Sequence, residues 1–313
     1  MMQGNSIAQQ DLLALGIDAG GTGTRWALLS PGGALIAEGE VPGFSANELL
    51  SSDGAAVATL LAELARQVLA VGRPARVHAG LTGLDAGNEA LARLITAPLG
   101  LGPEALSLGS DIETAYRDLF APGEGYVVYA GTGSIAAFLD AEGTLHRSGG
   151  RGYLLDDGGG GYWIAREALR RVWRAEDERP GAWRESPLAQ ELFAQMGGSD
   201  WAITRQFVYG GKRGDVGRLA LAVARAAERD PVALDLVSRA GEELARLGRA
   251  LLQRHGPRPL ALSGRAATLH PRLAEAMSEA LPPDTPFTCR PCQGHHAAAR
   301  LALAAVLRQE ARP

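Results

Sequence analysis

Two short turns rich in glycine and threonine carry the residues best suited to chemistry. The first, DAGGTGTR over 18–25, places the carboxylate of Asp18 at the end of an apolar strand. Glycines let backbone N–H groups approach an anion, and threonine hydroxyls add donors. Asp18 could also hold hydrated magnesium, which prefers one or two carboxylates plus waters and phosphate oxygens. The plain alternative is a tight hairpin with a capping aspartate.

The second turn repeats the first. The run YVVYAGTGSIAAFLDAEGTL from Tyr126 aligns Ala130 with Ala19 and Leu139 with Leu29, with one glycine fewer in the turn. Both copies read as strand, turn, strand, turn, strand. Two donor turns on opposite sides can hold a polyphosphate, which one hairpin cannot do. The repeat therefore predicts two similar domains that share a nucleotide site.

Other nucleotide and nucleophile motifs are missing. The single lysine, Lys212, is followed by Arg213, so no P-loop of the form GxxxxGK[ST] exists. Residues 131–136 fit GxGxxA, but the segment after them reads as a hairpin, whereas a dinucleotide fingerprint must open a helix. No GxSxG nucleophile elbow occurs. P-loop, Rossmann and serine-hydrolase functions are therefore not supported.

Alternating strands and helices must position these turns. After the first repeat, we expect helices at 47–71, 88–96 and 111–120 and strands at 76–81 and 106–109. After the second repeat, we expect a helix from near Tyr162 and then a helical region interrupted near Pro187, 197–198, 210–211 and 230–231. Beyond it we expect strands at 259–262 and near Phe287. Two further helices are expected at 271–280 and from His295. This order predicts an α/β fold with mostly parallel sheets extended from antiparallel hairpins.

Composition restricts the class of partner. The 313 residues are 46% hydrophobic and 21% charged, which is typical of a globular protein of two domains. The formal net charge is −4, without a basic cluster, so nucleic-acid and anionic-membrane partners are not expected. No apolar run is long enough to cross a membrane, and no basic residue precedes Arg25 as a secretory leader would require. We therefore expect a cytoplasmic protein.

Several segments together resemble a known family. These are the two turns, SDIET at 110–114, GGRGYLLDDGGGGYWIAREAL at 149–169 and LALSGRAA at 260–267. Their types and order resemble the BadF/BadG/BcrA/BcrD ATPase family, and within it the N-acetylglucosamine kinases of the actin, hexokinase and heat-shock chaperone ATPase superfamily. The resemblance implies two duplicated ribonuclease-H-like domains around a nucleotide-binding cleft. The first domain would comprise 1–119 plus 295–313, on the sugar and phosphate side, and the second 120–294, on the nucleotide side with a helical insertion.

The resemblance also implies the binding residues, with ATP and magnesium as cofactors. The nucleotide residues are Asp18, Gly20, Gly21, Thr22 and Thr24 in the first phosphate motif, Gly131, Thr132, Gly133 and Ser134 in the second, and Ser263 and Gly264 in the adenosine motif. The sugar residues are Asn47, Thr82, Gly83 and Asp157. Asp18 would hold magnesium through water. The chain departs from the family at Asp156, Gly158 and Arg265, and Ile135 stands where N-acetylglucosamine kinases can carry asparagine.

Asp111 is the candidate catalytic residue. It follows the expected strand at 106–109 directly and therefore lies at the carboxyl end of a sheet, where open α/β folds bind ligands. It also matches the family's catalytic aspartate. Phosphoryl transfer asks such a residue mainly to orient the attacking hydroxyl. Without the resemblance, the favoured explanation is that Ser110 and Asp111 are ordinary helix-start residues.

These residues predict an ATP-dependent amino-sugar kinase, with N-acetylglucosamine 6-phosphate as the expected product. Glucosamine is the alternative substrate, because Ile135 weakens the case for an N-acetyl group. A second alternative is a BadF-type ATPase that drives a partner protein, although no cysteine pair for a cluster at a dimer interface is evident. A sugar sensor is the third. The resemblance is compatible with a homodimer.

Four potential zinc ligands fall within 289–296: Cys289, Cys292, His295 and His296. Structural zinc sites usually take their ligand pairs from segments a dozen or so residues apart, and neighbouring helical side chains point roughly 100° apart. We therefore interpret the cysteines as a reduced pair before the closing helix.

Overall fold

The computed structural model describes residues 12–21, 23–46, 54–84 and 89–310. The chain divides into two compact units. Unit 1 comprises Met1–Asp118 and Gln293–Pro313, and unit 2 comprises Leu119–Cys292. Unit 1 is thus discontinuous, because its last segment follows the whole of unit 2.

Among the described residues, unit 1 contains one mixed five-stranded sheet with the order β3-β2-β1-β4-β5. Its strands are β1 (Leu13–Ala19), β2 (Gly23–Leu29), β3 (Leu35–Pro42), β4 (Pro74–Leu81) and β5 (Leu106–Ser110). The first three are antiparallel neighbours, while β4 and β5 run parallel to β1. The antiparallel start and parallel extension were both expected from the sequence.

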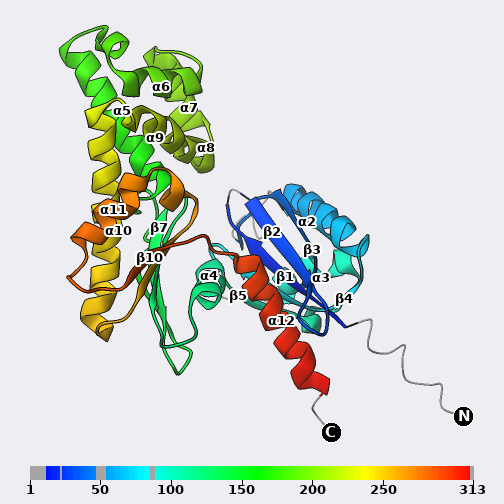
Figure 1. Cartoon of the computed structure of the whole chain (residues 1–313). Helices are drawn as coiled ribbons and strands as arrows, with labels where there is room; N and C mark the ends of the chain where they lie inside the picture. Colours follow the sequence, from blue (N-terminus) through cyan, green and yellow to red (C-terminus); the bar gives the residue numbers. More distant parts are fainter. Residues whose placement is uncertain (1–11, 22, 47–53, 85–88, 311–313) are drawn as a thin grey trace, which may run out of the picture. The chain divides into compact units, whose positions relative to one another are not determined.

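Helices cover both faces of this sheet. They are α2 (Gly54–Leu69), α3 (Glu89–Thr96), α4 (Asp111–Leu119) and α12 (Gly294–Glu310). Because side chains alternate along a strand, Leu15 and Ile17 of β1 face the core shared with α2 and α3, whereas Ala14 faces α12. Figure 1 shows α12 beside β1 and β2.

Unit 2 repeats the same topology in the order β10-β9-β6-β7-β8. Its strands are β6 (Tyr126–Ala130), β7 (Ser134–Leu139), β8 (Leu145–Gly149), β9 (Leu260–Ser263) and β10 (Phe287–Cys289). Strands β6, β7 and β8 are antiparallel, and β9 and β10 run parallel to β6. The correspondence with β1 to β5 confirms the predicted duplication of a ribonuclease-H-like α/β fold.

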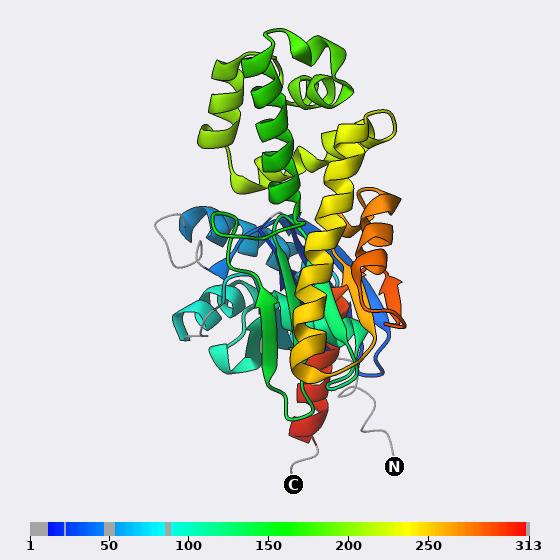
Figure 2. The ribbon, with the colours of Figure 1, turned by 90° about the vertical axis from the view of Figure 1, so that its left-hand side faces the viewer.

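Most helices of unit 2 lie between β8 and β9. They are α5 (Gly161–Glu178), α6 (Pro187–Met196), α7 (Trp201–Gly210), α8 (Arg213–Arg218), α9 (Ala220–Ala227) and α10 (Pro231–His255), and α11 (Pro271–Ala280) follows β9. Breaks near Pro187, 197–198, 210–211 and 230–231 fall where the sequence predicts them, whereas the break at Leu219 between α8 and α9 was not expected. Asp230 caps α10 and also accepts a hydrogen bond from the N–H of Leu188 at 2.9 Å, which ties α6 to α10. Figure 2 shows α10 running from the other helices down along the sheet of this unit. None of the helices in the described ranges combines the length and apolar character that crossing a membrane requires.

Candidate functional site

The carboxyl edge of the unit 1 sheet brings three candidate residues onto adjacent strands. Ala19 of β1 pairs with Leu81 of β4, and Leu81 pairs with Ser110 of β5. Asp18 lies one residue before this row, while Thr82 and Asp111 each lie one residue after it. Parallel neighbouring strands end at the same edge of a sheet, so Asp18, Thr82 and Asp111 all lie within one residue of this row.

Thr82 and Asp111 are in direct contact. The Thr82 hydroxyl donates a hydrogen bond to Oδ2 of Asp111, and the Thr82 N–H donates to the carbonyl of Ala19 at 3.0 Å. Oδ1 of Asp111 accepts from the N–H of Ile112 at 2.9 Å. Asp111 is the first residue of α4, whose N-terminus favours a negative charge. The carboxylate is therefore held at both oxygens while its side chain stays partly exposed.

Asp18 lies against the start of α12. A methyl group placed on Gly294 would lie 2.7 Å from Oδ2 of Asp18, so only glycine lets the helix begin this close to the carboxylate. The first turn is closed by a hydrogen bond from the Gly20 N–H to the Gly23 carbonyl at 3.1 Å. A methyl group on Gly21 would meet no atom within 4 Å, so the space over this exposed residue is open.

The other sugar and phosphate candidates of unit 1 fall into two groups. Thr22 and Asn47 lie outside the described residues. Thr24 is fully buried in β2, and its hydroxyl has no hydrogen-bond partner among the described residues. Gly83 is exposed next to Thr82 and has a φ of +74°, a conformation that favours glycine.

In unit 2, the second turn forms the seat for the N-terminus of α5. The Gly161 N–H donates to the Gly131 carbonyl and the Tyr162 N–H to the Thr132 carbonyl, each at 2.9 Å. A methyl group on Gly160 would lie 2.6 Å from the backbone of Gly133. This close contact between two backbones explains why glycines stand on both sides of it.

Ser134 and Asp157 support this turn from inside. The buried Ser134 hydroxyl donates to the Gly158 carbonyl at 2.7 Å. Asp157 is 5% exposed, and its Oδ1 accepts from the Gly152 N–H at 3.2 Å. Burial raises the pKa of the Asp157 carboxyl, and the hydrogen bond from Gly152 and the charge of Arg213 counteract it. Ser134 and Asp157 thus lie beneath the turn.

The adenosine motif lies at the neighbouring strand end. Ser263 pairs with Tyr129 of β6, and its hydroxyl is fully buried without a partner among the described residues. Gly264 has a φ of +98°, and a methyl group there would lie 2.3 Å from the Ala130 carbonyl oxygen. Gly264 is therefore restricted to glycine both by its conformation and by its contact with β6.

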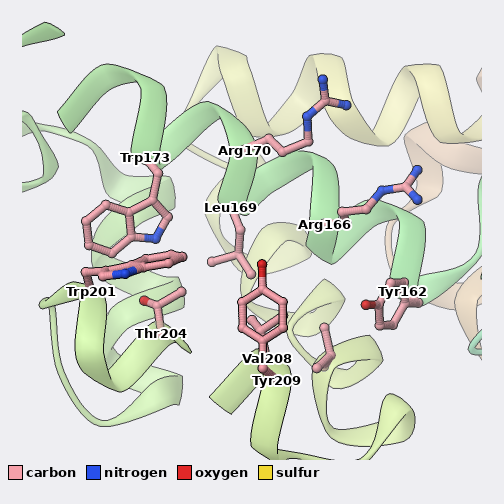
Figure 3. A pocket seen from close by; sticks show the side chains of 10 residues that line it. Tyr162, Arg166, Leu169, Arg170, Trp173, Trp201, Thr204, Val208 and Tyr209 are labelled. Atoms are coloured by element: carbon pink, nitrogen blue, oxygen red, sulfur yellow. The ribbon is translucent and has the colours of Figure 1, made fainter. Parts of the chain in front are cut away.

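A cavity of about 220 Å³ opens among α5, α7 and α8 (Figure 3). Trp173 and Trp201 meet at its wall with ring centroids 5.4 Å apart. The Trp173 Nε1 and the Thr204 hydroxyl also line it, buried and without partners in the described part of the chain. None of the site residues expected from the sequence belongs to its lining, and the helical spacing of this region gave no signal for it.

The histidines at the start of α12 form a cluster that the sequence did not predict. His295 and His296 both contact Glu38 of β3, and one ligand atom from each of the three side chains lies within 4.8 Å of the other two. The expected divergence of the two rings is wrong, because their ring centroids lie 4.3 Å apart and both Nε2 atoms reach the same Glu38 oxygen. Within the described ranges, Cys289 and Cys292 belong to no such three-ligand cluster.

Three known proteins with related sequences or structures carry the name of an N-acetylglucosamine kinase. A provisionally named N-acetylglucosamine kinase from Chromobacterium violaceum is 27% identical, with a TM-score of 0.72 over 94% of this chain and 99% of that one. The N-acetyl-D-glucosamine kinase of Dictyostelium discoideum is 46% identical over 54 residues, which are 17% of each protein. The N-acetylmuramic acid/N-acetylglucosamine kinase of Clostridium acetobutylicum is 37% identical over 70 residues, 22% of this chain and 23% of the enzyme. The aligned segments thus span less than a quarter of these two enzymes.

The sequence model of one family extends over most of both units. It matches residues 15–283, which include both glycine turns, Asp111 and the adenosine motif. Together with the duplicated topology, this match confirms the predicted family. The chain belongs to the BadF/BadG/BcrA/BcrD ATPase family.

Proposed function

We propose that the protein is an ATP-dependent kinase that transfers a phosphoryl group to the 6-hydroxyl of N-acetylglucosamine. The observation that carries this proposal is the Asp111 carboxylate, held by Thr82 at the carboxyl edge of the unit 1 sheet. Family membership and the kinase names of the similar proteins support the same reaction. Glucosamine is the alternative acceptor, since Ile135 occupies a position where N-acetylglucosamine kinases can carry asparagine.

Asp111 is assigned the role of orienting the acceptor hydroxyl. Thr82 and the N–H of Ile112 hold the two carboxylate oxygens in place, and the partly exposed side chain is the group assigned to accept the sugar hydroxyl. Phosphoryl transfer proceeds through a loose transition state in which positioning matters more than early proton removal. Thr82 acts through Asp111 as a positioning residue. Gly83, Asn47 and Asp157 remain predicted sugar contacts.

The two glycine turns and the adenosine motif are assigned to ATP. The N–H groups of Gly20 and Gly131 close the turns by donating to the carbonyls of Gly23 and Gly133. The backbones of Gly21 and Gly133 are therefore assigned to contact phosphate oxygens, with Thr132 beside them in the second turn. The buried hydroxyl of Ser263, which has no partner within the described ranges, fits a polar ligand at this strand end.

Asp18 fits magnesium by its chemistry. A carboxylate at a strand end, next to a position where any side chain larger than glycine would crowd it, suits a cation that retains most of its waters. Magnesium bound there would neutralise charge on the phosphates. Asp18 would hold it through a water molecule.

The first experiment measures ADP release from Mg·ATP without sugar and with N-acetylglucosamine, glucosamine or glucose. Stimulation by N-acetylglucosamine, with the phosphate located on O6 by NMR, is the expected result. Stimulation by glucosamine alone would move the proposal to the alternative acceptor. ADP release that no sugar stimulates would contradict a sugar kinase and favour an ATPase that drives a partner protein.

Replacing Asp111 tests its role directly. Asp111→Asn should lower the rate of phosphoryl transfer by at least about 100-fold, because the amide cannot accept the hydroxyl proton. Binding of a fluorescent ATP analogue should stay within about twofold, because the residue acts on the acceptor. Glu113→Gln is the matched control, since it removes a carboxylate from the same helix, where Glu113 pairs with Arg117 at 2.9 Å. Equal turnover by Asp111→Asn and the unsubstituted protein would remove Asp111 from the mechanism.

A further inference from the structure

Glu38, His295 and His296 converge although they are far apart in the chain. Oε2 of Glu38 lies 2.7 Å from Nε2 of His296 and 3.2 Å from Nε2 of His295. Ligand atoms at 2.0–2.2 Å from a zinc ion stand roughly 3.4 Å apart in a tetrahedral site. The two observed distances are those of hydrogen bonds, and the three ligand atoms lie within 4.8 Å of one another. A bound ion would require the exposed Glu38 side chain to move back by a few tenths of an ångström.

The backbone fixes this convergence. Glu38 pairs with Ala27 of β2, a residue that packs against α12, so Glu38 projects from the sheet face that α12 covers. The start of α12 is held on β1, where a methyl group on Gly16 would lie 2.2 Å from the His295 carbonyl oxygen. A strand and a helix that are both anchored thus present the three ligands.

The ring of His295 is suited to donate a lone pair. It is 6% exposed, and its Nδ1 is buried without a hydrogen-bond partner in the described part of the chain. No second hydrogen bond therefore fixes the tautomer, and the proton can reside on Nδ1 while Nε2 faces Glu38. Burial lowers the pKa of His295, which favours the neutral imidazole that a metal requires. The hydrogen bonds from both histidines lower the pKa of Glu38, which favours its carboxylate form. Without metal these hydrogen bonds place a proton on each Nε2, and a bound ion would replace those protons.

Two features of the surroundings oppose a cation. The N-terminus of α12 carries partial positive charge, and Arg25 of β2 lies near enough to lower the pKa of His295. Arg25 is itself paired with Glu40 at 3.8 Å, which offsets part of its charge. Two neutral imidazoles and one carboxylate retain a net negative charge.

We propose that Glu38, His295 and His296 form a binding site for a divalent transition-metal cation of the zinc class. Two imidazoles and one carboxylate are a ligand set used for zinc with a fourth position open to water. Imidazole disfavours magnesium, so this site is chemically distinct from Asp18. A bound ion would join β3 to the start of α12, next to the contact between Gly294 and Asp18.

The experiment uses the full chain without a histidine tag, in a Cys289→Ser, Cys292→Ser background that removes competing thiols. Zinc chloride is titrated by calorimetry in excess magnesium, and cobalt(II) is titrated by visible absorption as a probe of nitrogen and oxygen coordination. One equivalent of zinc should bind. Glu38→Gln and His296→Ala should each weaken binding by at least about tenfold, the scale seen even for residues that only orient metal ligands.

Glu89→Gln is the matched control because it removes a carboxylate from α3, where Glu89 pairs with Arg93, on the sheet face opposite to α12. It should leave the zinc affinity within about twofold, since it removes no ligand. Unfolding temperatures measured in EDTA show whether each variant folds. If His296→Ala is less stable than the parent, Glu38→Gln alone tests the site, because the Glu38 side chain is mostly exposed. The proposal is overturned if the parent binds no stoichiometric zinc, or if Glu38→Gln and His296→Ala bind it as tightly as the parent does.

Discussion

At the residue scale, the Thr82 hydroxyl holds one of the two carboxylate oxygens of Asp111. It occupies Oδ2, while the first N–H of α4 after Asp111 occupies Oδ1. Each residue follows a predicted strand and could be selected from the sequence. Their contact depends on the pairing of Leu81 with Ser110, and this register is not readable from either segment alone.

His78 is a buried histidine of β4, three residues before the end of that strand at Leu81. Its Nδ1 lies 2.8 Å from the Ser107 hydroxyl, whereas Nε2 has no partner among the described residues. Burial lowers its pKa from 6.5 to about 4, with a smaller opposing contribution from Glu113 and a reinforcing one from Arg117. The folded protein therefore holds His78 in the neutral form.

This burial predicts an acid-labile contribution to stability. The contribution is complete above the unfolded pKa of 6.5 and is lost as the pH falls toward 4, because only the unfolded chain takes up the proton in that window. The free energy of unfolding should fall by about 2 kcal/mol from this residue between pH 7.5 and pH 5. Urea denaturation of the unsubstituted protein and His78→Asn at both pH values measures it, and the variant should lose that part of the pH dependence. Ser107→Ala, which removes the partner but not the titrating group, should keep it. An unchanged slope in His78→Asn would refute the assignment.

At the element scale, local pattern was sufficient for the strands and most helix ends. Apolar runs separated by glycine turns gave the hairpins, and Pro187, Pro231 and Pro271 begin helices where proline is tolerated. The duplication followed from comparing the chain with itself. These features depend on residues that are close in the chain, so they can be predicted from one sequence.

Features built from distant segments were not predictable in the same way. Glu38 meets His295 and His296 across 257 and 258 positions, through the packing of α12 on the sheet. The burial of Asp157 beneath the second turn depends on how α5 seats there. The sequence therefore indicated candidate residues but not which of their atoms are already engaged.

The packing of α12 on β1 depends on one glycine. A methyl group on Gly16 would lie 2.1 Å from the Ala299 nitrogen, and backbone cannot yield as a side chain does. Gly16→Ala should lower the free energy of unfolding by about 3 kcal/mol, measured by urea denaturation. Gly32→Ala, whose methyl group would come no closer than 3.9 Å to a neighbour, should change it by less than about 0.5 kcal/mol. Similar values for the two variants would mean that α12 does not pack on β1 this closely.

At the scale of the whole molecule, unit 1 is completed only by the end of the chain. Helix α12 buries Ala299, Ala302 and Leu303 against Ala14, Ala27 and Leu29 on one face of the sheet. Unit 2 runs without interruption from Leu119 to Cys292 and has its own sheet and helices. The two units therefore differ in their dependence on α12.

Removing α12 should lower the stability of unit 1 and leave that of unit 2 unchanged. A chain ending at Cys292 loses the burial of four alanines, Leu303 and Val306, which is worth about 6 kcal/mol and is comparable with the whole stability of a typical domain. Limited proteolysis with mass spectrometry should then degrade residues 12–118 and leave 119–292 protected. A chain ending at Arg308 is the control and should resist in both units. Equal protection of both units without α12 would show that unit 1 does not need it, and loss of both would show that unit 2 cannot fold alone.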